Sequence, residues 1–335
     1  MEAIVYKVDT DEMAGRFTRM ESQVPKVEGH DLLVKIQAIS VNPVDYKVRQ
    51  RISTPEDGSK VLGWDAAGIV ESVGDRVSLF KPGDRVFYAG DIARNGSYAS
   101  HQLVDEYIVG LMPESLDFAA AAALPLTSIT AWEALFDRIK INPDVDAGKQ
   151  ILIIGGAGGV GSIAIQLAKQ VARLNVIATA SREESRQWCL SLGADKVINH
   201  NEDIRHQYKH YDLSAPDYIL CLNDTDSYFE LMSELVAPQG MICSIVESRQ
   251  SYNMDKLKSK SAGFVWEFMF SRSMYQTADR IKQHEMLNKI AELVDSGKIT
   301  STLNKTYSQL SVENIIAAHN QLEDGSCIGK IVLVR

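Results

Sequence analysis

The chain has 335 residues, of which 45% are hydrophobic and 24% are charged. That length and composition are typical of a folded protein of about two domains, which excludes a disordered or fibrous chain. The net charge of −9 argues against nucleic acid or an anionic membrane as the main partner.

The first hundred residues carry short strands separated by turns. Leu32–Ile39 and Ala66–Gly74 are predicted strands, and Pro82-Gly83 fits the two central positions of a type II turn. This pattern predicts a small, barrel-like β lobe.

From about residue 116 the pattern becomes helical and then alternates. Asp117–Leu124 is a predicted helix stopped by Pro125, and Thr127–Ile139 is a second one. The predicted strands that follow are Gln150–Ile154, Asn175–Ala180, Lys196–Ile198, Tyr218–Leu222 and Met241–Val246. The predicted helices are Val160–Leu174, Arg182–Leu192, Ser227–Leu235, Thr277–Ser296 and Ser311–Glu323, before a last strand at Ile328–Val334. Alternation of this kind predicts a doubly wound parallel sheet, so the fold class is α/β.

Neither targeting nor cysteine chemistry stands out. The N-terminal residues Met1–Lys7 contain no apolar signal core, and the uncharged stretch Gln150–Ala168 is too glycine-rich for a lipid-facing helix. The four cysteines contain no C-x-x-C pair, so they indicate neither a zinc knuckle nor a disulfide framework. We therefore expect a cytoplasmic protein without membrane contact.

The strongest motif is a glycine-rich loop between a predicted strand and a predicted helix. It contains Gly156, Gly158, Gly159, Val160 and Gly161 in the pattern G-x-G-x-x-G. Glycines let the backbone approach a pyrophosphate, whose charge is favoured at the helix N-terminus. The motif predicts a dinucleotide site, with a glycine-rich structural turn as the alternative.

The end of the second strand indicates which dinucleotide is preferred. A site for NAD usually has an acidic residue about 20 positions after the glycines, where this chain has Ser181 and Arg182. A hydroxyl and a guanidinium can hold a 2′-phosphate, and Arg186 follows one helical turn later. We expect NADPH, although Glu183 is nearby and a solvated helix start is the alternative.

The chain resembles the medium-chain dehydrogenase/reductase superfamily, in its zinc-lacking quinone-oxidoreductase-like branch. It is most similar to the bacterial group called zinc-type alcohol dehydrogenase-like. The resemblance rests on Ser40–Lys47, Gly63–Gly68, Lys81–Val86, Ala121–Thr127, Gly155–Gly161 and Gly329–Leu333. It implies a GroES-like catalytic domain of residues 1–124 plus 271–335, an inserted Rossmann domain of residues 125–270, and an active site in the cleft between them.

The resemblance also makes zinc a point to test. Zinc members place a Cys at Asn42, a His near Lys47, a His-Glu pair at Trp64-Asp65 and a further Cys near Pro125-Leu126. None of those Cys or His ligands is present, and catalytic zinc needs three protein ligands. We therefore expect no metal.

Without zinc, hydrogen-bond donors must stabilise the substrate oxygen. The resemblance places Asn42, Tyr46 and Lys47 beside the nicotinamide, where each can donate to developing negative charge. A packed tyrosine and a solvated lysine are the alternatives for Tyr46 and Lys47.

Four further cofactor contacts and one interface are implied by resemblance. Thr130, His200, Val246 and Lys330 are the expected contacts. The alternatives are a plain helix residue for Thr130, an exposed histidine for His200 and structural packing for Lys330. Residues 264–270, rich in aromatics, correspond to the sheet edge that pairs between subunits, which predicts a homodimer.

The expected function is NADPH-dependent reduction of quinones, or of C=C bonds conjugated to a carbonyl, with a small carbonyl or quinone as substrate. One alternative is an alcohol or aldehyde dehydrogenase, which the missing zinc ligands disfavour. The other is a non-catalytic NADPH-binding protein.

Overall fold

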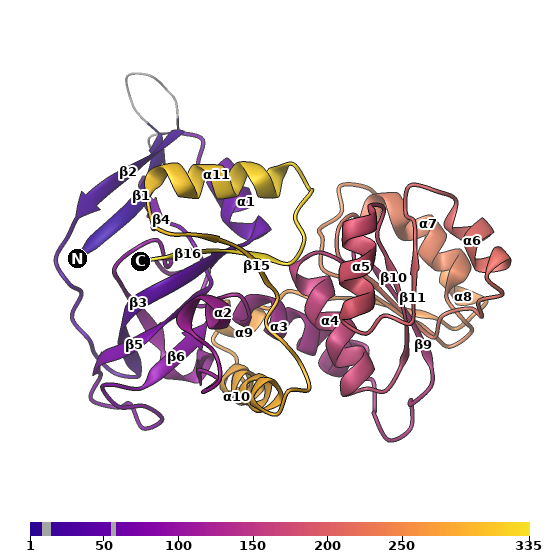
Figure 1. Ribbon diagram of the computed structural model, residues 1–335, viewed down its shortest axis with the longest axis horizontal. Coiled ribbons are helices and arrows are strands. Elements are labelled where there is room, and N and C mark those ends of the chain that lie inside the picture. Colours follow the sequence, from indigo (N-terminus) through magenta and orange to yellow (C-terminus); the bar gives the residue numbers. More distant parts are fainter. Residues whose placement is uncertain (9–14, 55–57) are drawn as a thin grey trace. The chain divides into compact units, whose positions relative to one another are not determined.

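The computed structural model describes residues 1–8, 15–54 and 58–335, and the chain divides into two compact units (Figure 1). Unit 1 contains Met1–Ile129 and Phe270–Arg335, so both ends of the chain build it. Unit 2 is the continuous segment Thr130–Met269. The boundaries expected from the sequence were 124/125 and 270/271.

Unit 1 is built on two β-sheets. A seven-stranded sheet has the order β15-β16-β3-β5-β6-β8, with β7 also paired to β3, and a three-stranded sheet has the order β2-β1-β4. The strands are β1 (Glu2–Val8), β2 (Gly15–Glu21), β3 (Asp31–Val41), β4 (Lys60–Val61), β5 (Ala66–Val73), β6 (Arg85–Tyr88), β7 (His101–Asp105), β8 (Val109–Leu111), β15 (Leu303–Tyr307) and β16 (Lys330–Val334). The C-terminal strand β16 pairs antiparallel with β3, which joins the two ends of the chain in one sheet.

Helices of varied length connect and cover these strands. They are α1 (Pro43–Arg51), the 3₁₀ turn η2 (Glu106–Ile108), α2 (Phe118–Ala122), α3 (Pro125–Trp132), α9 (Ser271–Met274), α10 (Lys282–Asp295) and α11 (Val312–Glu323). Helix α3 crosses into unit 2 and continues as the π-helix η3 (Glu133–Arg138). Pro125 starts α3, a position where its missing N–H leaves no helical hydrogen bond unmade.

Unit 2 contains a six-stranded parallel sheet with helices between the strands. The strand order is β11-β10-β9-β12-β13-β14. The strands are β9 (Gln150–Ile154), β10 (Asn175–Thr179), β11 (Lys196–Ile198), β12 (Tyr218–Cys221), β13 (Met241–Ser244) and β14 (Gly263–Trp266). The helices are α4 (Gly159–Gln170), α5 (Glu183–Ser191), α6 (Ile204–His210), α7 (Thr225–Leu235) and α8 (Asp255–Lys258). The strand order runs 3-2-1-4-5-6, so the predicted doubly wound sheet is confirmed.

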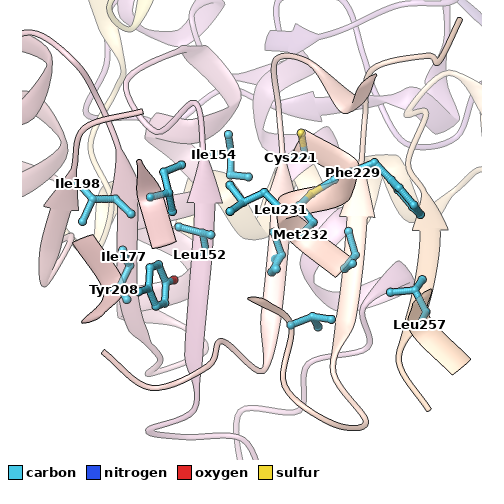
Figure 2. Packing of buried hydrophobic residues seen from close by; sticks show 14 residues of the cluster. Leu152, Ile154, Ile177, Ile198, Tyr208, Cys221, Phe229, Leu231, Met232 and Leu257 are labelled. Carbon is cyan, nitrogen blue, oxygen red and sulfur yellow. The ribbon is translucent and has the colours of Figure 1, made fainter. Parts of the chain in front are cut away.

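Alternate side chains of each central strand point to opposite faces of this sheet. Figure 2 shows one face, where Leu152 and Ile154 of β9 pack with Phe229 and Met232 of α7. Tyr208 of α6 and Leu257 of α8 complete the same buried cluster. Helices cover both faces of a parallel sheet, so its strands are apolar on both sides. This explains the continuous apolar runs from which these strands were predicted.

Element ends differ from the sequence predictions for local reasons. Helix α4 stops at Gln170, because Arg173 adopts a left-handed conformation with φ 57° and breaks the predicted continuation to Leu174. Helix α10 begins only at Lys282, after a turn in which Asp279 accepts hydrogen bonds from Arg272 and Thr277. Helix α6, capped by Asp203, was not predicted.

The continuous helical run Phe118–Arg138 is long and apolar enough to cross a membrane, by length and composition alone. Its most apolar 18-residue window is 78% buried within the protein, however. A core helix of a soluble protein passes the same test, so the run is weak evidence for a membrane span.

Candidate functional site

Three neighbouring strands of unit 1 bring three polar side chains to one place. Ile331 of β16 pairs with Val41 of β3, and Ile39 of β3 pairs with Ala66 of β5. This register brings together the side chains of the residues next to these pairs, which are Lys330, Asn42 and Asp65. All three are buried, with exposed fractions of 3%, 1% and 0%.

The Lys330 ammonium lies among three oxygen acceptors. It donates to the carbonyl of Val41 at 2.9 Å, to Asp65 Oδ2 at 3.1 Å and to Asn42 Oδ1. The other oxygen of Asp65 accepts the backbone N–H of Leu126 at 2.8 Å. Burial raises the pKa of Asp65, while Lys330 and the donated hydrogen bonds oppose that rise.

Asn42 is fully engaged in this cluster. Its amide nitrogen donates to Asp65 Oδ2 at 2.9 Å and to the carbonyl of Ser40 at 3.4 Å. Its predicted role as a donor to substrate oxygen stays a prediction, and it requires that one of these hydrogen bonds be exchanged.

The residues at this position do not fit a zinc ion. One carboxylate, one amide and an ammonium replace the three nitrogen, sulfur or oxygen ligands that a catalytic zinc takes. The ammonium also lies on Asp65, where its charge would repel a cation. Across residues 1–8, 15–54 and 58–335, no three His, Cys, Asp or Glu side chains gather in a way that could hold a metal.

A second buried network starts at the N-terminus of α1. Asp45 Oδ2 accepts the backbone N–H of Asn42 and the hydroxyl of Tyr98, both at 2.9 Å. Tyr98 also lies 2.8 Å from His319 Nε2, and Arg49 lies 3.3 Å from His319 Nδ1. A guanidinium only donates, so His319 Nδ1 is the acceptor and Nε2–H donates to Tyr98.

The charge states in this network follow from burial. Burial lowers the pKa of His319 to about 3, so the ring is neutral at pH 7. Burial also raises the pKa of Asp45 to about 7, although the hydrogen bonds from Asn42 and Tyr98 oppose the rise. Tyr98 and His319 were not predicted from the sequence, because a lone histidine in an amphipathic helix gives no signal of such a contact.

Helix α1 carries the other two predicted donors. Tyr46 is half-buried, and burial followed by the charge of Glu323 raises the pKa of its phenol. Lys47 is partly exposed on the same helix. Thr130 is 5% exposed in α3. Their predicted roles stay predictions.

In unit 2, the glycine loop joins β9 to α4 and is shaped by its glycines. Gly155 has φ +88°, and a Cβ on Gly161 would lie 2.4 Å from the carbonyl oxygen of Gly155. A Cβ on Gly156 would lie 2.8 Å from that of Ala178 in β10, so the loop packs closely against the neighbouring strand. Gly158 is the N-terminal cap of α4, and a Cβ there would meet nothing closer than 3.6 Å.

The start of α4 is therefore open to a ligand, although the residues on either side of it are closely packed. Gly158, Gly159 and Val160 are partly exposed, while the strand before and the helix after are buried. Backbone N–H groups at a helix start attract anions, and glycine leaves room for them. The cradle fits the pyrophosphate of a dinucleotide.

The predicted phosphate-binding residues lie at the end of the neighbouring strand. Ser181 follows β10, Arg182 is the N-terminal cap of α5, and Arg186 lies one turn on; both arginines are exposed. His200 lies just after β11, where its Nδ1 is buried without a hydrogen-bond partner and burial lowers its pKa. Val246, after β13, accepts a hydrogen bond through its carbonyl from Thr225.

Comparison with known proteins gives the family of the chain. Residues 28–126 match the alcohol dehydrogenase GroES-like domain, and residues 192–333 match the zinc-binding dehydrogenase model. A zinc-type alcohol dehydrogenase-like protein of Staphylococcus epidermidis is 46% identical over 336 residues, covering 99% of each chain. The chain belongs to the medium-chain dehydrogenase/reductase superfamily.

Two further proteins are similar to this chain over most of its length. The 2-methylene-furan-3-one reductase of Solanum lycopersicum is 32% identical over 327 residues, which are 94% of this chain and 75% of that one. A crystal structure from Rhizobium etli, described as a candidate zinc-dependent alcohol dehydrogenase, has 44% identity and a TM-score of 0.92, covering 100% of this chain and 98% of the other. The predicted fold, a Rossmann sheet inserted into a GroES-like domain, is confirmed, and the chain is an oxidoreductase of this type.

Proposed function

We propose that this oxidoreductase uses NADPH, without zinc, to reduce quinones or C=C bonds conjugated to a carbonyl. The observation that carries the proposal is the Lys330 ammonium, held by Asn42 and Asp65 where zinc members bind their metal. The reductase from Solanum lycopersicum supports the substrate class, because its name describes an exocyclic C=C beside a ketone.

The cofactor would lie along the carboxyl edge of the unit 2 sheet. The open backbone at Gly158–Val160 fits the pyrophosphate, and Ser181 with Arg182 supports recognition of a 2′-phosphate. Both groups lie at helix starts, where the helix dipole favours negative charge. The cofactor when bound supplies a hydride from its nicotinamide ring.

The protein's own residues must then meet the charge that collects on the substrate oxygen. All three N–H groups of Lys330 already have acceptors, so its predicted cofactor contact stays a prediction and requires that one of these hydrogen bonds be exchanged. Tyr46 and Lys47 on α1 carry hydrogen-bond donors that can stabilise an oxyanion. Protonation of the product can come from solvent.

NADPH oxidation with a panel of quinones and enones tests the proposal. Tyr46→Phe should lower turnover roughly 100- to 1,000-fold, as loss of one such donor does in other enzymes. Tyr307→Phe, in β15 of the same unit, is the matched control and should leave turnover unchanged. Full activity of Tyr46→Phe with every substrate would remove Tyr46 from the mechanism.

The relatives' names favour a zinc-dependent alcohol or aldehyde dehydrogenase as the second candidate. Metal analysis of protein purified without an affinity tag should find well under one zinc per chain. A stoichiometric zinc required for activity, together with good reduction of simple aldehydes and none of enones, would establish that alternative.

We also propose a homodimer formed through residues 264–270. Strand β14 ends the sheet order, and Trp266 and Phe268 beside it are 46% and 43% exposed. An exposed strand edge with aromatic side chains favours pairing, and two-fold symmetry closes such an assembly.

A further inference from the structure

The loop after β13 is held by two adjacent residues of helix α7. Thr225 is fully buried and donates its hydroxyl to the carbonyl of Val246 at 2.5 Å. Asp226, next in the chain, accepts from the Ser248 hydroxyl at 2.7 Å and from the backbone N–H of Arg249 at 3.0 Å. The two anchors leave the exposed Glu247 between them.

Asp226 also binds the far end of the same loop. The hydroxyl of Tyr252 donates to Asp226 Oδ1, and its ring stacks on Phe229 of α7 with centroids 4.2 Å apart and an interplanar angle of 12°. The three donors hold the pKa of Asp226 below its usual range. One carboxylate thus fixes the loop at Ser248, Arg249 and Tyr252.

This loop follows strand β13, at the edge of the sheet where a ligand is expected to bind. Parallel strands present their carboxyl ends at one edge, where an open α/β sheet binds ligands at its topological switch point, here between β9 and β12. With the pyrophosphate at the β9 loop, the predicted adenosine contacts Ser181 and His200 follow β10 and β11. The second nucleotide must then extend toward β12 and β13, about 10 Å away at the usual strand spacing.

We propose that Asp226 is a positioning residue that holds the loop Val246–Tyr252 in place for the nicotinamide nucleotide. This inference rests on the proposed dinucleotide function. Asp226 needs no contact with the cofactor: it orders the loop beforehand, so that binding does not carry the ordering cost. Its removal should weaken the nicotinamide half of the site and leave the adenosine half intact.

Binding of two ligands to the full-length protein separates these halves. 2′,5′-ADP carries only the adenosine half with its 2′-phosphate, whereas NADPH adds the nicotinamide nucleotide, whose fluorescence reports its surroundings. Asp226→Asn should weaken NADPH roughly tenfold, reduce the fluorescence gain on binding, and leave the affinity for 2′,5′-ADP unchanged. Tyr252→Phe removes one of the three donors and should give a smaller loss of the same kind.

The matched control is Glu230→Gln, one turn further along α7. Glu230 is exposed and pairs with Lys256, outside the loop. It should bind both ligands as the wild type does, and thermal unfolding checks that every variant is folded.

The outcomes distinguish this inference from the function on which it rests. Unchanged NADPH binding in Asp226→Asn, an equal loss of 2′,5′-ADP, or an equal effect in Glu230→Gln would overturn the positioning role alone. A wild type that prefers NADH would overturn only the phosphate preference, and NADH with AMP would then replace the two ligands. A wild type that binds no dinucleotide would overturn both.

Discussion

Replacing Lys330 with methionine would keep most of its volume and remove the buried ammonium. The Asp65 carboxylate, fully buried, would then lack its cation. At the observed 3.1 Å the attraction is about 5 kcal/mol for an effective dielectric of 20. Breaking a buried pair by removing one partner typically costs about 3–5 kcal/mol, so we expect a loss of that size at pH 8.

The loss should depend on pH with a definite sign. Burial already raises the pKa of Asp65, and removing Lys330 takes away the main opposing charge. A carboxyl whose folded pKa lies above its unfolded value stabilises the fold at low pH and loses that contribution as pH rises. Lys330→Met should therefore be closer to the wild type at pH 5 than at pH 8.

Hydrogen exchange of amides in β3 and β16 measures this effect within unit 1. Adding Asp65→Asn should restore part of the lost stability, because the pair then disappears without leaving a buried charge. A loss under about 1 kcal/mol at pH 8, or a double variant no more stable than Lys330→Met, would refute the argument.

Three further predictions test other parts of the molecule. Arg182→Ala should weaken NADPH about tenfold to a hundredfold and leave NADH nearly unchanged; equal affinity of the wild type for both cofactors, by titration, would contradict this. The free energy of unfolding of Asp45→Asn should rise relative to that of the wild type between pH 4 and pH 8, by up to about 4 kcal/mol. The reason is that the folded pKa of Asp45, about 7, lies above its unfolded value, so the wild type loses stability as pH rises. Parallel pH profiles of the two proteins in urea unfolding would refute this. Trp266→Ser with Phe268→Ser should lower the sedimentation mass from twice 37.1 kDa to one chain, whereas Tyr275→Ser, 72% exposed in unit 1, should not; a monomeric wild type would exclude the dimer.

The sequence predicted unit 2 well, because its signals are local. Apolar runs such as Ile151–Ile154 leave few alternatives to a buried parallel strand, and the glycine loop follows directly. The predicted end of α4 was wrong because Arg173 adopts a left-handed conformation, which an arginine in a sequence does not predict.

The cluster in unit 1 could not be predicted in the same way. Lys330 and Asn42 are 288 residues apart and meet only through the register of β16 against β3. The absent zinc ligands identified Asn42 and Asp65 as replaced positions, but nothing local assigned Lys330 to them. His319 is hidden for the same reason, since its partners Tyr98 and Arg49 lie far away in the chain.

The Lys330 cluster also narrows the choice of donor for the substrate oxygen. A catalytic zinc ion keeps an open coordination position for substrate. The ammonium of Lys330, by contrast, donates its three N–H groups to Val41, Asn42 and Asp65. Both amide hydrogens of Asn42 are engaged as well. The ion pair between Lys330 and Asp65 thus holds these strand ends together, but it offers no donor that could polarise a substrate carbonyl. We expect that task to fall to α1, where Tyr46 and Lys47 are the two candidates and Tyr46→Phe tests the first of them.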